Sequence, residues 1–225
     1  NSDPKLSHVT VIGNTLYGGY GAGLAIKNSA SYLSDIIISN NETPYDAGGI
    51  YLQNCNSIII TNAIIEDNTA NYGAGIYIES STPFLINVKI SGNVATGNGG
   101  GINTTGGDAT FEIINSLIVD NIASNGGGIA QWSVTGGGRP TIINTTISGN
   151  SAQISGGGIY CWGSSTNDLT IHNSIISNNQ PSDISLAYNG SILATYSDIL
   201  GGWAGTGNIN ADPLFVDAAN GDYRL

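Results

Sequence analysis

The chain has 225 residues, enough for one large domain or two small ones, and its balance of 40% hydrophobic to 9% charged residues argues against intrinsic disorder. A net charge of −11, with only five lysine and arginine residues, excludes the basic surface that a nucleic-acid partner needs. An anionic polysaccharide would also be repelled unless a cation intervened. No apolar run is long enough to span a membrane, and no signal peptide is recognisable. Because the chain begins at Asn1 and not at Met, we expect a mature protein or a piece of a longer one.

A repeat organises nearly the whole chain. Each unit has a glycine run followed by an aliphatic residue, as in Gly156-Gly157-Gly158-Ile159. The aliphatic residues that follow successive runs are 26, 26, 26, 27 and 30 residues apart. Self-similarity at a nearly fixed period in this range predicts a stacked repeat architecture. These residues are Leu24, Ile50, Ile76, Ile102, Ile129 and Ile159.

Two polar columns keep a constant offset of six residues through the repeat. We expect the main column to point inward and its amides to bond to the coils above and below. Each residue before the main column is Gly, Asn or Asp, the types that tolerate a left-handed backbone at a corner. The main column is Asn14, Asn41, Asn68, Asn93, Asn121, Asn150 and Asn179, and the second is Asn62, Asn87, Asn115, Asn144 and Asn173, with His8 and Asp35 in its first two places.

Three short strand patterns recur in each unit: one before the second column, one between the columns and one after the glycines. The pattern between the columns has an unbroken β-branched position, which indicates an inward-facing strand residue. The sequence therefore predicts a single all-β domain, a parallel β-helix of about eight coils over residues 1–207, with an irregular closing segment at 208–225. The inward position is Val11, Ile38, Ile65, Ile90, Ile118, Ile147 and Ile176.

The two cysteines are not expected to form a disulfide. Cys55 falls in the second coil and Cys161 in the sixth. Four coils at roughly 4.8 Å each place them about 19 Å apart, whereas a disulfide needs Cα atoms within about 7 Å. We therefore expect two free thiols, with Cys161 buried as a small hydrophobic residue.

The glycine runs with their Ile-Ser-Gly-Asn turns resemble the GGxI and FxxN repeats of polymorphic outer-membrane proteins and autotransporter passengers, with Ile or Val in place of Phe. The chain as a whole resembles the pectate-lyase-like right-handed β-helix. Residues 208–217 with 221–225 are similar to the segment that closes this fold in large secreted bacterial surface proteins. The resemblance implies the right-handed sense, since the spacing alone indicates only a β-solenoid. Relatives of this kind include lyases, hydrolases, adhesins and phage spikes, so fold does not settle function.

Catalytic groups are sparse. The resemblance implies, for a lyase, a basic residue near calcium held by several Asp, and for a hydrolase, paired Asp motifs with Gly-His-Gly; neither pattern is present. Asp46 and Glu79 could approach each other across coils two and three, so they are the residues to watch in an enzyme. Asp183, in coil seven, is too far from either. Asp67 and Asp120 are explained by their place in the corner column.

The closing segment contains a weak metal candidate. Asp212, Asp217 and Asp222 recur every five residues and could bind calcium, although the spacing is unlike an EF-hand and turn chemistry explains them equally well. No other cofactor is indicated.

Aromatic residues are the strongest candidates for ligand binding. Alternation in the strand after the glycines turns several rings outward, where they could stack on sugar rings or anchor a protein. The alternative is that tyrosine is simply a favourable exposed strand residue that stacks across coils. The candidates are Tyr45, Tyr51, Tyr72, Tyr77, Trp132, Tyr160 and Trp162.

These observations favour a non-catalytic, adhesin-like or structural solenoid, secreted or on the cell surface of a bacterium or archaeon, that binds glycan or protein through this aromatic face. The alternative is a secreted polysaccharide lyase or hydrolase. Because the first coil has no recognisable cap, we also expect upstream coils or a neighbouring subunit to cover it.

Overall fold

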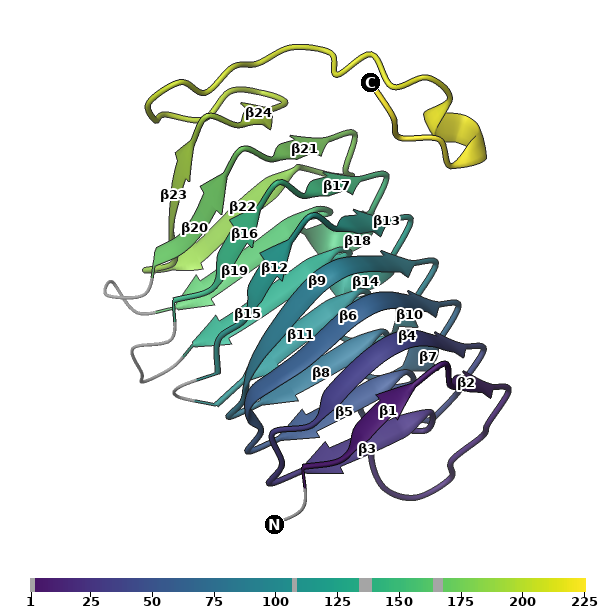
Figure 1. Ribbon diagram of the computed structural model, residues 1–225. Coiled ribbons are helices and arrows are strands. Elements are labelled where there is room, and N and C mark those ends of the chain that lie inside the picture. Colours follow the sequence, from purple (N-terminus) through teal and green to yellow (C-terminus); the bar gives the residue numbers. More distant parts are fainter. Residues whose placement is uncertain (1–2, 107–108, 134–138, 164–167) are drawn as a thin grey trace.

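A computed structural model describes residues 3–106, 109–133, 139–163 and 168–225. The strands wind into a parallel β-solenoid of about seven turns, stacked from the N-terminal coil at one end to the C-terminal coil at the other (Figure 1). Each strand pairs in parallel with its counterpart one coil away; Ile102, for example, lies between Ile76 and Ile129. The predicted all-β parallel solenoid is thus confirmed.

Three sheets form the walls, with 13, four and seven strands. The 13-stranded sheet holds β1 (Lys5–Ser7), β2 (Thr10–Ile12), β4 (Tyr32–Ser39), β6 (Asn56–Glu66), β9 (Thr82–Ser91), β12 (Glu112–Ile114), β13 (Leu117–Val119), β16 (Thr141–Ile143), β17 (Thr146–Ser148), β20 (Asp168–His172), β21 (Ile175–Ser177), β23 (Ser191–Thr195) and β24 (Asp198–Ile199). The four-stranded sheet holds β7 (Thr69–Ala70), β10 (Val94–Ala95), β14 (Ile122–Asn125) and β18 (Ser151–Ser155). The seven-stranded sheet, which follows the glycine runs, holds β3 (Leu24–Lys27), β5 (Ile50–Gln53), β8 (Ile76–Glu79), β11 (Ile102–Thr105), β15 (Ile129–Ser133), β19 (Ile159–Gly163) and β22 (Ile184–Tyr188).

The sheets divide the coil differently from the strand patterns in the sequence. In β4, β6 and β9 the two patterns on either side of the second polar column run on as one strand. The small four-stranded sheet, by contrast, lies between the main asparagine column and the glycines, where no strand was expected. Its inward residues are alanines, such as Ala70, Ala95 and Ala123, which form a small apolar cluster of their own with Ala74.

The inner face of the solenoid is filled by aliphatic side chains. The predicted column of Ile38, Ile65, Ile90, Ile118, Ile147 and Ile176 is 0–1% exposed throughout, which confirms the inward assignment. Cys55 and Cys161 do not form a disulfide, as predicted, and Cys161 is buried as expected; Cys55 is buried too.

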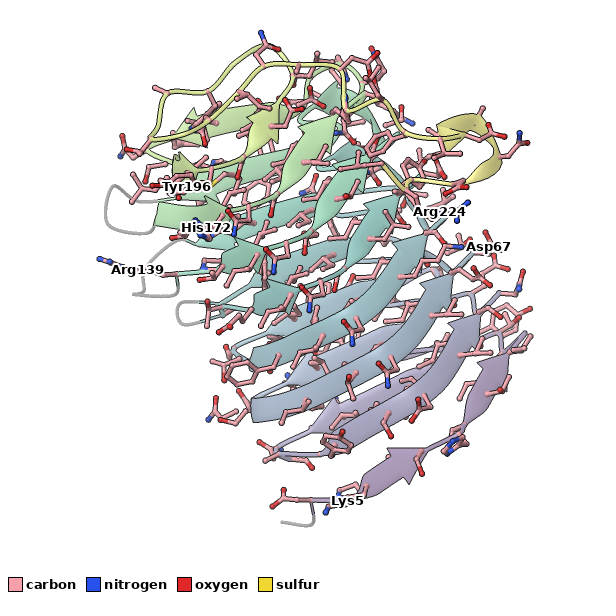
Figure 2. All side chains as sticks on the ribbon, turned by 45° about the horizontal axis from the view of Figure 1, so that its top comes forward. Lys5, Asp67, Arg139, His172, Tyr196 and Arg224 are labelled. Atoms are coloured by element: carbon pink, nitrogen blue, oxygen red, sulfur yellow. The ribbon has the colours of Figure 1, made fainter. Side chains whose placement is uncertain are left out.

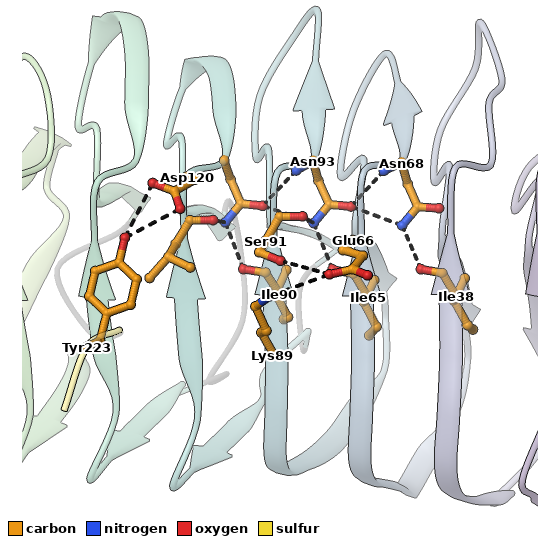
Figure 3. A network of polar contacts seen from close by, with 12 residues as sticks. Ile38, Ile65, Glu66, Asn68, Lys89, Ile90, Ser91, Asn93, Asp120 and Tyr223 are labelled. Carbon is orange, nitrogen blue, oxygen red and sulfur yellow. Dashed lines mark hydrogen bonds and ion pairs between the residues drawn. The ribbon is translucent and has the colours of Figure 1, made fainter. Parts of the chain in front are cut away.

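The main asparagine column forms a continuous ladder inside one corner (Figure 3). The Nδ2 of Asn68 donates to the Oδ1 of Asn93 at 3.0 Å, and the same Oδ1 accepts from the backbone N of Asn68 at 3.0 Å. A further bond from Asn68 Nδ2 reaches the carbonyl of Ile38 in the preceding coil at 3.0 Å. The five amides between the ends of the ladder each tie three coils together in this way, and the predicted stacking is confirmed.

Left-handed residues make the corners. The column before the ladder has φ between 55° and 71° at all seven places: Gly13, Asn40, Asp67, Gly92, Asp120, Gly149 and Asn178. The second asparagine column is left-handed as well, with φ from 48° to 54°, but it lies on the outside. There it forms an exposed ladder, in which Asn87 donates to Asn62 at 3.3 Å and Asn144 to Asn115 at 3.1 Å.

The count of about seven turns is close to the eight coils expected, and the difference lies at the C-terminal end. Ile209, which the spacing places in an eighth coil, forms only an isolated bridge with Asp198. After β24 the chain does not turn into another coil, and Trp203 packs against the core. The remaining tail crosses the last coil and descends along the side of the solenoid through a short 3-10 helix, η1 (Ala218–Asn220), until the Tyr223 hydroxyl reaches Asp120 at 3.4 Å (Figures 1 and 3).

Candidate functional site

The outer face of the seven-stranded sheet carries two clusters of aromatic rings, and we refer to it as the aromatic face. In the first cluster the rings of Tyr20, Tyr51 and Tyr77 stack with centroid distances of 5.1 and 5.7 Å. Tyr51 and Tyr77 align because they are direct partners in β5 and β8, whereas Tyr20 comes from the loop before β3. Tyr45 meets Tyr20 edge to face at 6.5 Å, and the Lys27 ammonium lies 5.2 Å from the Tyr51 ring centroid.

The second cluster lies nearer the C-terminal end. Trp132 and Trp162 are direct partners in β15 and β19, and their rings are 4.9 Å apart. Tyr160 lies 5.8 Å from Trp132, and Tyr188 of β22 meets Trp162 edge to face at 4.7 Å. The parallel register therefore carries ring contacts across three successive coils.

Between the clusters the row of rings is interrupted in β11. Asn103 occupies the place that Tyr77 holds one coil below and Ala130 one coil above. Because neither Asn103 nor Ala130 fills the space that a ring would take, the interruption leaves a hollow of about 270 Å³. Its lining is Tyr72, Tyr77, Asn98, Asn103, Thr105 and Trp132.

The predicted ligand-binding residues differ in their accessibility. Tyr45 is 45% exposed and Tyr72 is 37% exposed, while Tyr77, Trp132, Tyr160 and Trp162 are half-buried. Tyr51 is only 1% exposed, so the expectation of an accessible ring there is wrong. Its ring is held between Tyr20 and Tyr77, and its hydroxyl donates to Glu79.

The structure adds two rings to the candidates. Tyr20 completes the first stack, and Tyr188 extends the second cluster at 83% exposure. Tyr188 follows Ile184, which continues the aliphatic spacing beyond the last glycine run, so counting from Ile184 could have found it. Tyr20 lies four residues before Leu24, the offset that Tyr72 has from Ile76, so its place in the loop equivalent to that of Tyr72 was readable from the sequence.

The carboxylates of Asp46 and Glu79 come together beside the first cluster. Glu79 Oε2 accepts a bond from Gln53 Nε2 at 3.1 Å and another from the Tyr51 hydroxyl. Burial, and secondarily the charge of Glu79, raise the pKa of Asp46. Burial is also the main cause of the raised pKa values of the Tyr51 and Tyr77 hydroxyls. The pair thus offers one carboxyl that is easier to protonate and one that is engaged in hydrogen bonds.

Family comparison agrees with this architecture. Residues 1–118 match the model of the right-handed β-helix region. The chain belongs to the right-handed β-helix family. Residues 144–161, which contain the unit from Asn144 to Cys161, match the repeat of the Chlamydia polymorphic membrane protein. No curated protein and no solved structure gives a significant match.

Of the basic side chains in this β-helix, Lys27 lies over the Tyr51 ring of the first cluster, 5.2 Å from its centroid, whereas the other four lie elsewhere. Lys5 lies near the N-terminal end, and Arg139 and Arg224 project from different sides of the solenoid (Figure 2). Lys89 pairs with Glu66 at 3.5 Å. Within the described parts of the chain, no three His, Cys, Asp or Glu side chains form a group that could hold a metal ion.

The three acids of the tail are each engaged in local contacts. Asp212 accepts from the backbone N of Leu214 at 3.0 Å, and Asp217 accepts from Asn220 Nδ2 at 2.8 Å. Arg224 binds Asp222 at 2.5 Å and lowers the pKa of that carboxyl to about 2. These contacts are turn chemistry, the alternative that the sequence had left open for them.

Asp67, Asp120 and Asp183 have structural places in the coils. Asp67 and Asp120 occupy left-handed corners, as their column predicted, with φ of 55° and 57°. Asp183 ends the inner ladder, since its Oδ1 accepts from the N and Nδ2 of Asn179 at 3.0 and 2.7 Å. For the part of the chain that the structure describes, no helix is both long and apolar enough to cross a membrane.

Proposed function

We propose that this chain is a non-catalytic β-solenoid of the cell surface or extracellular space of a bacterium or archaeon, and that it binds glycan, or another protein, through the aromatic face. The observation that carries the proposal is the gathering of rings on the outside of one sheet. Tyr77, Trp132, Tyr160 and Trp162 are only half-buried, and Tyr188 is 83% exposed. Flat, partly exposed rings in register suit the apolar faces of sugar rings, and tyrosine and tryptophan also anchor protein interfaces.

The placement at the cell surface is supported by the match of residues 144–161 to the polymorphic membrane protein repeat. The composition agrees with it, because the chain carries a net charge of −11 and few cations that could bind an intracellular polyanion.

The test is a glycan array read beside a reducing-sugar assay and an unsaturated-product assay on the same preparation. We expect binding to one class of glycan without turnover, and loss of that binding in Trp162→Ala. Tyr196→Ala is the matched control, because Tyr196 is 57% exposed but contacts His172 on the 13-stranded sheet. Equal loss in both variants, or no loss in either, would refute binding through the aromatic face.

A polysaccharide lyase or hydrolase is the second candidate, and the Asp46–Glu79 pair favours it. An acid with a raised pKa next to a second carboxyl group is a familiar starting point for acid–base catalysis on sugars. Turnover that disappears in Asp46→Asn or Glu79→Gln, with the fold intact by circular dichroism, would replace the binding proposal with this one.

A further inference from the structure

The hollow between the two aromatic clusters has walls suited to a single ring. Tyr77 closes it on the N-terminal side and Trp132 on the C-terminal side, each with a half-buried aromatic side chain, and Tyr72 stands at its edge. Its volume of about 270 Å³ lies just below the range of roughly 300–1,000 Å³ that is usual for pockets of drug-sized ligands. The hollow therefore suits one six-membered ring better than an extended chain segment.

Two polar atoms in the lining have no partner. Asn103 Oδ1 and Trp132 Nε1 are both buried without a hydrogen bond, and Asn103 as a whole is 3% exposed. Buried polar groups in folded proteins are almost always paired, and each one that is not calls for an explanation. Here one atom is an acceptor and the other a donor, and both belong to side chains that line the same hollow.

An occupant with a hydroxyl group could satisfy both atoms. A hydroxyl donates one hydrogen bond and accepts others, so it can donate to Asn103 Oδ1 and accept from Trp132 Nε1–H. The terminal torsion of an asparagine amide is soft, which lets Asn103 turn its oxygen toward the hollow. A pyranose ring brings hydroxyls at its rim and an apolar face for the ring of Tyr77 or Trp132.

The surrounding charge selects against acidic sugars. Glu79 is the strand partner of Thr105, which lines the hollow. Asp46 forms an isolated backbone β-bridge with Tyr72, which stands at the edge of the hollow. Glu79 and Asp46 are therefore neighbours of residues that line the hollow, and the whole chain has a net charge of −11. A carboxylate or sulfate on the ligand would meet like charge and lose affinity.

We propose that this hollow binds one neutral pyranose ring, stacked on Tyr77 or Trp132, with a hydroxyl placed between Asn103 Oδ1 and Trp132 Nε1–H. The proposal rests on the proposed function, which assigns glycan binding to the aromatic face, and adds a subsite, its polar contacts and the charge class of the sugar.

The experiment follows the indole N–H signals of ¹⁵N-labelled protein during titration with methyl β-D-glucopyranoside, methyl β-D-galactopyranoside and methyl β-D-glucuronide. The chain has only three tryptophans, so Trp132→Phe identifies the Trp132 signal by its loss. We expect a saturable shift of that signal with at least one neutral pyranoside, at the millimolar concentrations expected for so small a ligand. The Trp203 signal should stay in place, and the glucuronide should bind more weakly.

Two variants test the contacts. Asn103→Ala and Trp132→Phe each remove one hydrogen-bonding atom, and each should weaken pyranoside binding roughly tenfold. Trp132→Phe keeps an aromatic wall and so serves if Asn103→Ala folds poorly; because it lacks the Trp132 indole signal, its binding is read from the backbone amide signals of β8 and β11, which line the hollow. Asn115→Ala is the control, because Asn115 is an exposed member of the outer ladder on another sheet, and it should leave binding unchanged.

The outcomes separate the two proposals. If glycans bind on the array and Trp162→Ala abolishes binding, while Trp132 never shifts and Asn103→Ala has no effect, the hollow is not the subsite but the aromatic face still binds. If no neutral pyranoside shifts Trp132, or if the glucuronide binds more tightly, the inference is overturned. If the protein binds no glycan on the array, the proposed glycan-binding function fails together with this inference.

Discussion

Replacement of one ladder asparagine should destabilise the solenoid far more than its size suggests. The Asn93 side chain is 0% exposed and takes part in five hydrogen bonds. Its Oδ1 accepts twice from Asn68, and its Nδ2 donates to Ile65 O, Ser91 O and Asn121 Oδ1 at 2.9–3.1 Å. Because the two N–H groups of the amide are shared among three acceptors, these contacts amount to four full bonds; at a net value of about 0.5–1.5 kcal/mol for each, Asn93→Ala should lower the free energy of unfolding by about 2–6 kcal/mol.

The matched control is Asn14→Ala at the N-terminal end of the same ladder. Asn14 is exposed, and its amide makes only two side-chain bonds, to Asn41 Oδ1 at 2.8 Å and Ile12 O at 3.4 Å. Water can replace both, so we expect a loss below about 1 kcal/mol. Urea unfolding should be followed by circular dichroism and by tryptophan fluorescence, because stacked coils can unfold in stages and coincident transitions are needed for a single free energy. A difference between the two variants of less than about 1 kcal/mol would refute the assignment of stability to the inner ladder.

Two further substitutions test the corners and the first aromatic stack. Gly126→Ala should cost about 2–5 kcal/mol of stability, because φ is 63° and the new Cβ would lie 2.4 Å from Ile129 O. The control Gly13→Ala, with φ of 71° and no atom near the new Cβ, should cost only about 1–2 kcal/mol. Equal losses of thermal stability in the two variants would show that the chain relieves the close approach at Gly126. Tyr51→Ala should lower the free energy of unfolding in urea by about 3–5 kcal/mol, because it removes a buried ring. The control Tyr17→Ala, at a residue that is 83% exposed, should lower it by less than about 0.5 kcal/mol. A small loss for Tyr51→Ala would mean that the three rings are not a packed unit.

The sequence predicted the interior of this protein well because the interior repeats. Equivalent positions in successive coils lie in the same environment, as Ile65 and Ile90 do, or Asn68 and Asn93. The sequence therefore shows the residue that suits each environment several times. The corner column was equally legible, because only Gly, Asn and Asp adopt the left-handed conformation readily. A single coil with the same residues would not have allowed these conclusions.

The outer surface was harder to read because its contacts do not repeat. The alternation rule correctly turned Tyr51 outward from the core, but it could not show that Tyr20, Tyr77 and Glu79 would bury it. The hollow could not be predicted from the sequence either. It arises because Asn103 has no aromatic ring where Tyr77 has one, and such an absence does not stand out in a sequence. The segment after β24 could not be read in the same way, because it has no counterpart in the repeat and folds by individual contacts.

Asp183 shows how a departure from the repeat becomes a testable feature. It serves as the acceptor that an asparagine of the next coil would supply, but as a carboxylate, and burial raises its pKa above the ordinary 3.8 although the bonds from Asn179 act in the opposite direction. Because the folded state holds the proton more tightly than the unfolded state, this group stabilises the fold fully below pH 3.8 and loses that contribution as pH rises through the raised pKa. Asp183→Asn keeps an oxygen acceptor and removes the buried charge, so it should be more stable than the parent at pH 7 and lose that advantage as pH falls toward 4. Subtracting the unfolding free energies of the two proteins at each pH cancels the titration of all other acids. A difference that does not change with pH would contradict the raised pKa of Asp183. A variant that is less stable at pH 7 would show that the ladder needs a carboxylate at its end.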